Sequence, residues 1–267
     1  MIANTSEDRP LRPEIQGLRA IAVAAVICFH IWPVLLQGGY IGVDIFFVIS
    51  GYLITGGLFR EACSDGTISL LRFYARRVRR LLPAATLVLI VVASATSLLP
   101  ETRWEETSFE IAASSIFLEN WALVWLATDY LSSENAASPV QHYWSLSVEE
   151  QFYLVWPILI MAGVIIARRL DWSLRFTLAV ALSATFAASL TCSVLLTASE
   201  PEGAYFLTHT RIWALALGGL LALCQGLWRP GETLRAIAGI TRLAAVIAAA
   251  VLFSPHSAFT NAGHRPR

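Results

Sequence analysis

In this 267-residue chain, Arg19 lies near the start of an apolar stretch, and His30 lies within the same stretch, eleven positions further on. In an α-helix, eleven residues return to within about 20° of the same face and rise about 16 Å, so Arg19 and His30 would line one groove at different depths. His30 could act there as a general base or as a nucleophile. The alternative is a hydrogen-bonded, structural histidine. The face that it shares with Arg19 favours the chemical role.

A second ionisable side chain falls at about the same depth as His30. Asp44 belongs to the string Gly42–Tyr52, which follows a short turn at residues 37–40. A carboxylate at this place could accept the second imidazole hydrogen, fix the tautomer and raise the basicity of the ring. The alternative is that Asp44 only caps the start of a helix near the outer surface.

Five arginines fall within nine residues of a predicted loop, immediately before another apolar stretch. Arg77 and Arg80 would share a helical face, as would Arg76 and Arg80. Paired guanidinium groups bind phosphate through two hydrogen bonds each, so this cluster could hold an anionic lipid head group or a nucleotide-like ligand. The alternative is that these arginines only set the orientation of the membrane span that follows.

Two adjacent acids lie near the start of a further apolar stretch. Glu149 and Glu150 follow Trp144 within the string Trp144–Leu154. Such residues are too costly to face lipid, so at least one should face the interior of a helix bundle, paired or protonated. The alternative is a solvated outer end of the helix.

The elements that would position these residues are membrane-spanning helices. The chain is 56% hydrophobic and only 14% charged, and its mean hydropathy is +0.61. A soluble domain carries about a quarter charged residues. We therefore predict an all-α, polytopic transmembrane helix bundle with about seven to eight membrane segments. The expected spans are Leu18–Leu36, Ile41–Phe59, Leu81–Leu99, Trp144–Ala167, Phe176–Leu196, Ile212–Trp228 and Ala236–Phe253, with Ile111–Tyr130 as a weaker candidate.

Charge and cysteine patterns exclude other classes of site. The formal net charge is zero, so no attraction to nucleic acid is implied, and the four cysteines have no metal-ligand spacing. We therefore expect no metal and no nucleic-acid partner.

The arginines are distributed unequally between alternate connections, which predicts the orientation. With a cytoplasmic N-terminus, 15 of the 19 basic residues fall in inner segments, and residues 101–143 hold only Arg103. Residues 101–143 must then cross the membrane an even number of times. We expect Ile111–Tyr130 to be re-entrant or to lie at the outer surface.

Taken together, these strings resemble the membrane acyltransferase-3 family, bacterial O-acetyltransferases that act on surface glycans. The resemblance covers about residues 11–225, in the family's order. It is carried by these segments: Arg12–Ala20, His30, Gly42–Tyr52, Phe73–Pro83, Trp144–Leu154 and Tyr205–Ala222.

The resemblance implies transfer of an acyl group, usually acetyl from acetyl-CoA or another acyl-CoA, to a hydroxyl of a cell-surface or lipid-linked glycan. The family's R-x10-H motif falls on Arg19 and His30, and its R-x-x-R motif falls on Arg77 and Arg80. The resemblance places its acidic segment on Glu149 and its late basic residue on Arg211. We expect His30, Arg19, Asp44 and Glu149 to be catalytic, and Arg77, Arg80 and Arg211 to bind substrate.

The chain departs from the family in two ways. The late motif commonly reads Arg-x-Trp-Glu-Leu, whereas this sequence has Ala214 in place of the glutamate. Relatives often continue into an extracytoplasmic SGNH esterase-like domain, so we expect a shortened member, which could work with a separate SGNH-type partner protein. The expected domains are a cytoplasmic tail at 1–10, an acyltransferase-3-like membrane domain at 11–253 and a polar tail at 254–267, in the bacterial plasma membrane.

Two other functions remain open at this point. Buried His, Asp and Glu also form proton relays, so a proton-coupled transporter is the main alternative, although the chain has no internal repeat of the kind that transporters often show. The other alternative is an inactive, truncated acyltransferase homologue.

Overall fold

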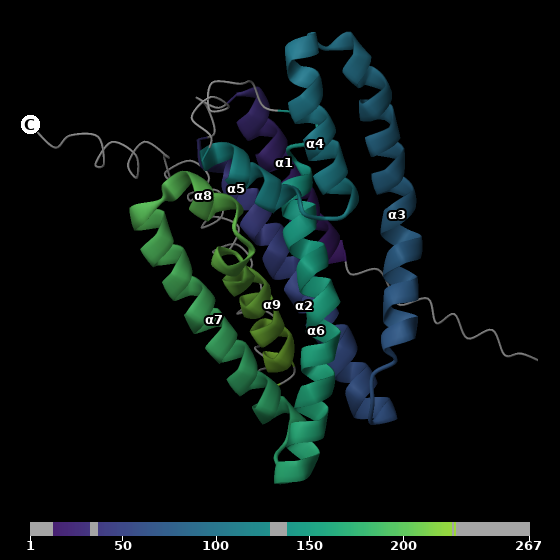
Figure 1. The fold of residues 1–267 in the computed structure, drawn as a ribbon. Coiled ribbons are helices and arrows are strands. Elements are labelled where there is room, and N and C mark those ends of the chain that lie inside the picture. The colour runs from purple at the N-terminus through teal and green to yellow at the C-terminus, as the bar shows by residue number, and fades with distance from the viewer. Residues whose placement is uncertain (1–12, 33–36, 129–137, 226, 228–267) are drawn as a thin grey trace, which may run out of the picture. The chain divides into compact units, whose positions relative to one another are not determined.

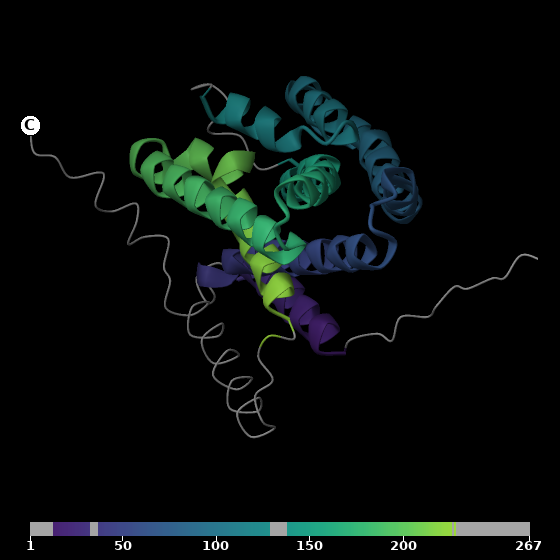
Figure 2. The same ribbon diagram turned by 90° about the horizontal axis from the view of Figure 1, so that it is seen from below.

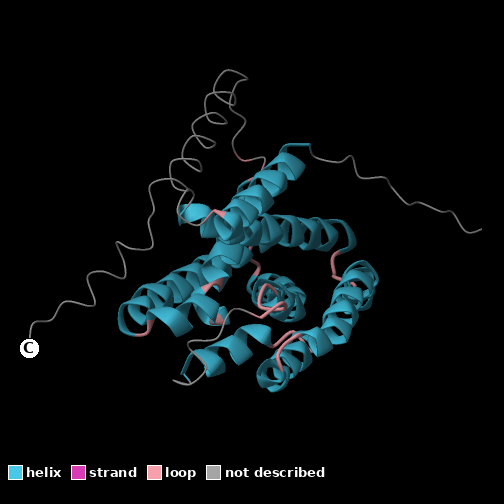
Figure 3. Cartoon of the chain, turned by 90° about the horizontal axis from the view of Figure 1, so that it is seen from above, coloured by secondary structure: helices cyan, strands magenta, loops and turns pink. Residues whose placement is uncertain are grey.

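The computed structural model describes residues 13–32, 37–128, 138–225 and 227. Over these residues the chain forms α-helices and short 3-10 helices and has no strand, which confirms the predicted all-α class (Figures 1 and 3). The expected span Ala236–Phe253 and both expected tails, 1–10 and 254–267, lie outside the described residues.

Five helical segments are long and apolar enough to cross a membrane. They correspond to α1 (Pro13–Ile31), α2 (Ile41–Asp65, preceded by the 3-10 turn η1, Gln37–Tyr40), α3 (Leu70–Ala95), α6 (Tyr143–Leu170) and α7 (Leu174–Ser199). The apolar helix α9 (Ile212–Cys224) is shorter, at 13 residues. These helices are compatible with the expected seven to eight segments but do not by themselves supply that number.

The expected loop of arginines is instead helical. Helix α3 begins at Leu70, eleven residues before the predicted start of this span at Leu81, so the arginines and the apolar residues share one continuous helix. Arginine is a good helix former, and Pro83 is tolerated inside the helix without ending it.

The segment between α3 and α6 contains none of the five candidate spans among its described residues. After the 3-10 turns η2 (Thr96–Leu98) and η3 (Glu101–Arg103), α4 (Trp104–Ser115) and α5 (Glu119–Thr128) are 12 and 10 residues long. A span needs roughly 20 residues. The chain turns sharply between them at 116–118, which we call the α4–α5 corner. Two short helices joined by a corner suit the re-entrant interpretation of this region.

The chain forms two compact units, one of residues 1–49 with 226–267 and the other of residues 50–225. In the first unit, α1 packs closely against η1 and the start of α2. A side chain at Gly39 or Gly42 would bring its Cβ within 2.5 Å of the carbonyl oxygens of Ala25 or Ala22, respectively. Glycine is therefore required at both positions for this close approach of backbones.

In the second unit, α3, α4, α5 and α7 are arranged around α6, which is seen nearly end-on in Figure 2. Two tyrosines join α3 to α6: the Tyr74 hydroxyl donates to the Leu154 carbonyl at 2.6 Å, and the Tyr143 hydroxyl donates to the Ala85 carbonyl at 2.8 Å. Helix α9 packs on α7, preceded by α8 (Pro201–Phe206) and η4 (Thr208–Thr210). These contacts fix α6 as the scaffold on which the site is built.

Candidate functional site

His30 lies in the last turn of α1 and is held by its own helix. Its Nδ1 is 2.8 Å from the carbonyl oxygen of Val26, one turn earlier. A carbonyl can only accept, so Nδ1 carries a hydrogen in this contact, and in the neutral ring the lone pair is then on Nε2. The ring is exposed, and Nε2 is the nitrogen that can act as a base or nucleophile.

The Nδ1 hydrogen, which the sequence analysis considered that Asp44 could accept, is bound by Val26, because a carbonyl at i−4 is already within reach of the ring. Asp44 lies in the first turn of α2 and is half-buried. A carboxylate at this place also interacts favourably with the helix dipole, as the capping alternative supposed.

Arg19 lies on α1, which stays helical from this residue to His30. Its Nε is shielded from solvent and has no hydrogen-bond partner among the described residues. An unpaired, shielded donor is costly and is a group that a bound anion or carbonyl oxygen would satisfy.

Glu149 faces the interior of the second unit. The hydroxyls of Ser50 on α2 and Tyr153 on α6 both donate to its Oε1. The contact with Ser50, which is almost fully buried, excludes the alternative of a solvated helix end. The sequence predicted that Glu149 or its neighbour would face inward, and both do.

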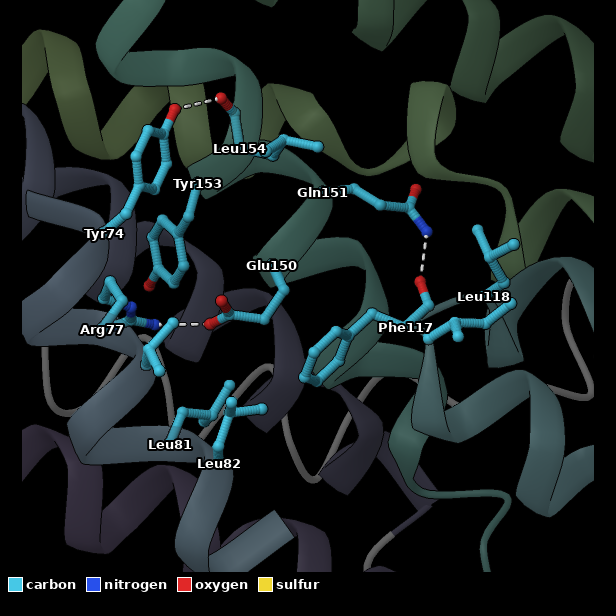
Figure 4. Close-up of a pocket in the computed structure, with 12 residues that line it drawn as sticks. Tyr74, Arg77, Leu81, Leu82, Phe117, Leu118, Glu150, Gln151, Tyr153 and Leu154 are labelled. Carbon is cyan, nitrogen blue, oxygen red and sulfur yellow. Dashed lines mark hydrogen bonds and ion pairs between the residues drawn. The ribbon is translucent and has the colours of Figure 1, made fainter. Parts of the chain in front are cut away.

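Glu150 forms the ion pair that the sequence analysis did not foresee. Its Oε1 lies 2.8 Å from Nη2 of Arg77, and the two side chains are only 14% and 18% exposed. The Arg77 guanidinium carbon lies 3.8 Å from the centre of the Tyr153 ring, a cation–π contact. Figure 4 shows Arg77 and Glu150 pointing toward each other from α3 and α6. The sequence could have indicated this pair, because one apolar helix carries a basic residue and another carries an acidic residue, and the two charges can neutralise each other when both are buried.

The arginines of α3 separate into an inner one and outer ones. Arg77 points inward and Arg80 is exposed, while Arg76, 51% exposed, lies 3.9 Å from a carboxylate oxygen of Glu61. The Nε of Arg77 is shielded and has no hydrogen-bond partner among the described residues, although its Nη2 is paired. Arg77 thus keeps one donor for a ligand.

A cavity of about 280 Å³ lies beside the Arg77–Glu150 pair. Its walls come from α3, the α4–α5 corner and α6, and they are mostly apolar, with Tyr74, Arg77, Glu150, Gln151 and Tyr153 as the polar members. An apolar cleft with a few convergent polar groups is the usual form of a small-molecule site.

Gln151 joins the corner to α6 and η4. Its Nε2 donates to the Phe117 carbonyl at 2.8 Å and to Oδ1 of Asn120 at 2.9 Å, while its Oε1 accepts from the Thr208 hydroxyl at 2.6 Å (Figure 4 draws the first contact). Sequence reasoning missed this residue, since a lone glutamine carries no spacing signal.

Arg211 is the N-cap residue of α9 and lies against α8. Its Nε donates to the Tyr205 carbonyl at 2.9 Å, and its guanidinium carbon is 4.3 Å from the centre of the Tyr205 ring. Ala214, which replaces the family's glutamate, is fully buried on α9.

The predicted site residues divide between the two units. Arg19, His30 and Asp44 belong to the first unit. Arg77, Arg80, Glu149 and Arg211 belong to the second, where the Tyr153 side chain contacts both Arg77 and Glu149. Among the residues that the structure describes, no group of three or more His, Cys, Asp and Glu side chains could hold a metal.

Comparison with known proteins gives a consistent result. A model of the family described as "Acyltransferase domain" matches residues 12–266. A Staphylococcus aureus protein named as a putative O-acetyltransferase is 36% identical over 220 residues, which are 82% of this chain and 35% of that protein. The peptidoglycan O-acetyltransferase OatA of Listeria monocytogenes is 33% identical over 222 residues, 83% of this chain and 35% of OatA. This chain thus spans about a third of the length of these relatives. No solved structure matches it.

Proposed function

Because this chain belongs to the acyltransferase domain family, we propose that it is a bacterial plasma-membrane O-acyltransferase with a cytoplasmic N-terminus. It moves an acyl group, acetyl in the first instance, from cytoplasmic acyl-CoA to a hydroxyl of a cell-envelope glycan. The name of the Listeria relative supports peptidoglycan as the first acceptor to test. A separate SGNH-type protein could receive or pass on the acyl group.

The observation that carries this proposal is the orientation of the His30 ring. Its Nδ1–H is bound to Val26, so Nε2 is the ring nitrogen outside this contact and carries the lone pair when the ring is neutral. Nε2 then either takes the proton of the acceptor hydroxyl or accepts the acyl group first, and both routes need a neutral ring with this lone pair. In either route a C–O bond to the glycan forms, the C–S bond of the thioester breaks, and the hydroxyl proton ends on the thiol of CoA.

The arginines of α3 are suited to the donor. Arg80 is exposed and can meet the phosphates of CoA, and the unpaired Nε of Arg77 offers a further donor beside the cavity. In this scheme Arg19 contacts the pantetheine arm, Asp44 stabilises the His30 imidazolium, Glu149 relays a proton or binds the sugar, and Arg211 positions substrate through α8 and α9.

The direct test uses the purified full chain in lipid nanodiscs, with acetyl-labelled acetyl-CoA and soluble peptidoglycan fragments. We expect release of the CoA thiol and a matching acetyl increment on glycan oxygen, detected by mass spectrometry. An inserted, folded chain that does neither would be an inactive homologue. Movement of acetyl or protons across proteoliposomes without loss of the thioester would identify a transporter. Either result overturns the proposal.

A further inference from the structure

Two buried carboxyl groups meet outside the five candidate spans, and nothing in the proposed function uses them. Glu110 on α4 is 2% exposed and Glu119, the first residue of α5, is fully buried. Each accepts one serine hydroxyl: Ser138 donates to Oε2 of Glu110, and Ser114 donates to Oε2 of Glu119 at 3.0 Å. The Oε1 of Glu119 is shielded and has no hydrogen-bond partner among the described residues. A hydrogen bond also joins the Glu110 and Glu119 side chains, which requires a proton on one of the two carboxyls.

The electrostatic surroundings favour a proton at this place. Burial, together with the neighbouring Glu110 carboxyl, raises the pKa of Glu119 to about 9. Burial likewise raises the pKa of Glu110. Burial and mutual repulsion make it unfavourable for two adjacent carboxyls to be ionised together at neutral pH, and this favours one proton held between them.

Two other charged side chains among the described residues act on the pKa of Glu110. On α4 and η3, Glu106 and Arg103 have opposite effects on the pKa of Glu110. From α6, the group that faces Glu119 is the Ser147 hydroxyl, which accepts from the Glu119 backbone N–H at 3.3 Å.

Two titratable side chains of the elements after α6 have ring contacts near α5 and α6. On α8, Tyr205 lies against the Trp144 ring, and on η4 the His209 ring lies 6.5 Å from that of Trp121, centre to centre.

The pair lies at a strained point of the backbone. Phe117, two residues before Glu119, has a φ of +57°, a conformation that bulky residues rarely adopt unless their surroundings impose it. The Ser114–Glu119 hydrogen bond closes the loop around this residue, from the end of α4 to the start of α5.

The same corner forms one wall of the cavity. Ile116, Phe117 and Leu118 line it together with Arg77 and Glu150, and the Phe117 carbonyl accepts from Gln151. The carboxyl pair therefore holds the segment that faces the Arg77–Glu150 ion pair.

We propose that Glu110 and Glu119 share one proton and that Glu119 is thereby a positioning residue, which fixes the α4–α5 corner as a wall of the Arg77–Glu150 cavity. The importance of that wall for donor binding rests on the proposed function, but the proton-held corner does not.

The test is hydrogen exchange of the full chain in detergent, measured by mass spectrometry on peptides covering 113–122, from pH 6 to pH 9 and corrected for the intrinsic pH dependence of exchange. The folded state holds a proton that an opened corner releases, so protection is greatest at low pH and falls as the pH rises toward about 9. One linked proton gives a fall of up to about tenfold per pH unit.

Glu119→Gln should remove this slope and keep the corner protected, because its amide N–H replaces the shared proton. Glu119→Ala should lose protection at every pH. Glu105→Gln, an exposed glutamate on the same helix as Glu110, should keep the wild-type slope. Glu110→Gln repeats the test from the other side if Glu119→Gln does not fold. The proposal would be overturned if the exchange protection of the wild-type corner did not change with pH. It would also be overturned if Glu119→Gln showed the same pH dependence of protection as the wild type.

Measurements of acetyl transfer then distinguish the proposed function from the proton-held α4–α5 corner. If the chain transfers acetyl, its turnover should fall toward pH 9 in the wild type and persist in Glu119→Gln. A pH-independent ratio of their turnovers would overturn the positioning role. If no transfer occurs but exchange behaves as described, the proposed function fails and the proton-held corner stands.

Discussion

His30 receives its orientation from the backbone of its own helix. The contact from Nδ1 to the Val26 carbonyl selects one tautomer of the neutral ring. The same contact leaves Nε2 as the ring nitrogen that the helix does not engage, and Nε2 is therefore the candidate to accept a proton or an acyl group.

Removing the imidazole should therefore abolish transfer without unfolding the protein. We expect His30→Ala to lower turnover at saturating donor by about 10²- to 10⁴-fold, the usual loss for a correctly placed general base. CoA affinity should change little, since the ring acts after binding. Asp44→Asn should have a turnover between those of the wild type and His30→Ala, because it removes only the charge that stabilises imidazolium.

The matched control is His209→Ala, which removes another exposed imidazole, on η4. It should keep wild-type turnover. Near-normal turnover of His30→Ala at wild-type abundance in the membrane would mean that His30 is structural.

The arginines of α3 should respond differently according to their burial. Arg77→Ala leaves the Glu150 carboxylate buried and unpaired, a change that typically costs about 3–5 kcal/mol of stability. Arg80→Ala removes an exposed charge, so it should leave the unfolding temperature nearly unchanged and weaken CoA binding. The unfolding temperatures and CoA affinities of the two variants check this. The double variant Arg77→Met/Glu150→Leu is measured in the same way, because it removes both charges of the pair and leaves neither one unpaired. Equal destabilisation by Arg77→Ala and Arg80→Ala would contradict it.

Sequence reasoning selected as candidates the residues that stand out from apolar surroundings, and it did not select those that do not stand out. Arg19, His30 and Glu149 are conspicuous because an ionisable group within an apolar helix is costly. Glu110 and Glu119 lie in a segment with many acids, and no spacing tells which of them the fold will bury. The choice between Asp44 and Val26 as the partner of His30 depends on rotamers, which sequence does not encode locally.

At the scale of elements, helix α2 meets α9 at a glycine. A Cβ at Gly51 would overlap the carbonyl oxygen of Leu215, so the two helices are in direct backbone contact there. Small residues allow such approach between membrane helices, where close van der Waals packing replaces the hydrophobic effect.

Gly51→Ala should push α2 and α9 apart and destabilise the fold by about 1–3 kcal/mol, the usual cost of overpacking. Gly57, on the same helix, has open space where a methyl group would be added, with no neighbouring atom within 4 Å, so Gly57→Ala should be neutral or slightly stabilising. Unfolding temperatures of the two variants in one detergent give the comparison. A Gly51→Ala protein as stable as Gly57→Ala would show that this contact is dispensable.

The sequence located the long helices well and their polar ends less well. The predicted span Trp144–Ala167 lies within α6, Tyr143–Leu170. The predicted span Phe176–Leu196 lies within α7, Leu174–Ser199. Both agree because hydropathy marks the apolar part of each helix. The weak candidate Ile111–Tyr130 divides at Phe117, where a positive φ breaks the helix. That break depends on tertiary contacts such as Gln151 with the Phe117 carbonyl, which lie outside the local sequence.

At the scale of the whole molecule, apolar side chains are exposed in numbers that water would not tolerate. On α3, Leu87, Ile90 and Val91 are each about 60% exposed, and none of the most apolar window of this helix is buried. Such a surface is stable when lipid covers it. The orientation in that lipid is then decided by the arginine distribution.

That orientation has a direct test in single cysteines at two exposed threonines. Thr67, between α2 and α3, should be cytoplasmic, and Thr102, between α3 and α4, should face outward. All four native cysteines are first replaced, because Cys63 and Cys224 are exposed and would react. A membrane-impermeant thiol reagent added to intact cells should then label Thr102→Cys and spare Thr67→Cys, and both should react after the membrane is opened.

Since α3 alone lies between the two sites, labelling of both in intact cells would mean that α3 does not span the membrane. Labelling of Thr67→Cys alone would invert the orientation and place Arg80 on the side opposite to cytoplasmic CoA, which would remove the donor site from the proposed mechanism.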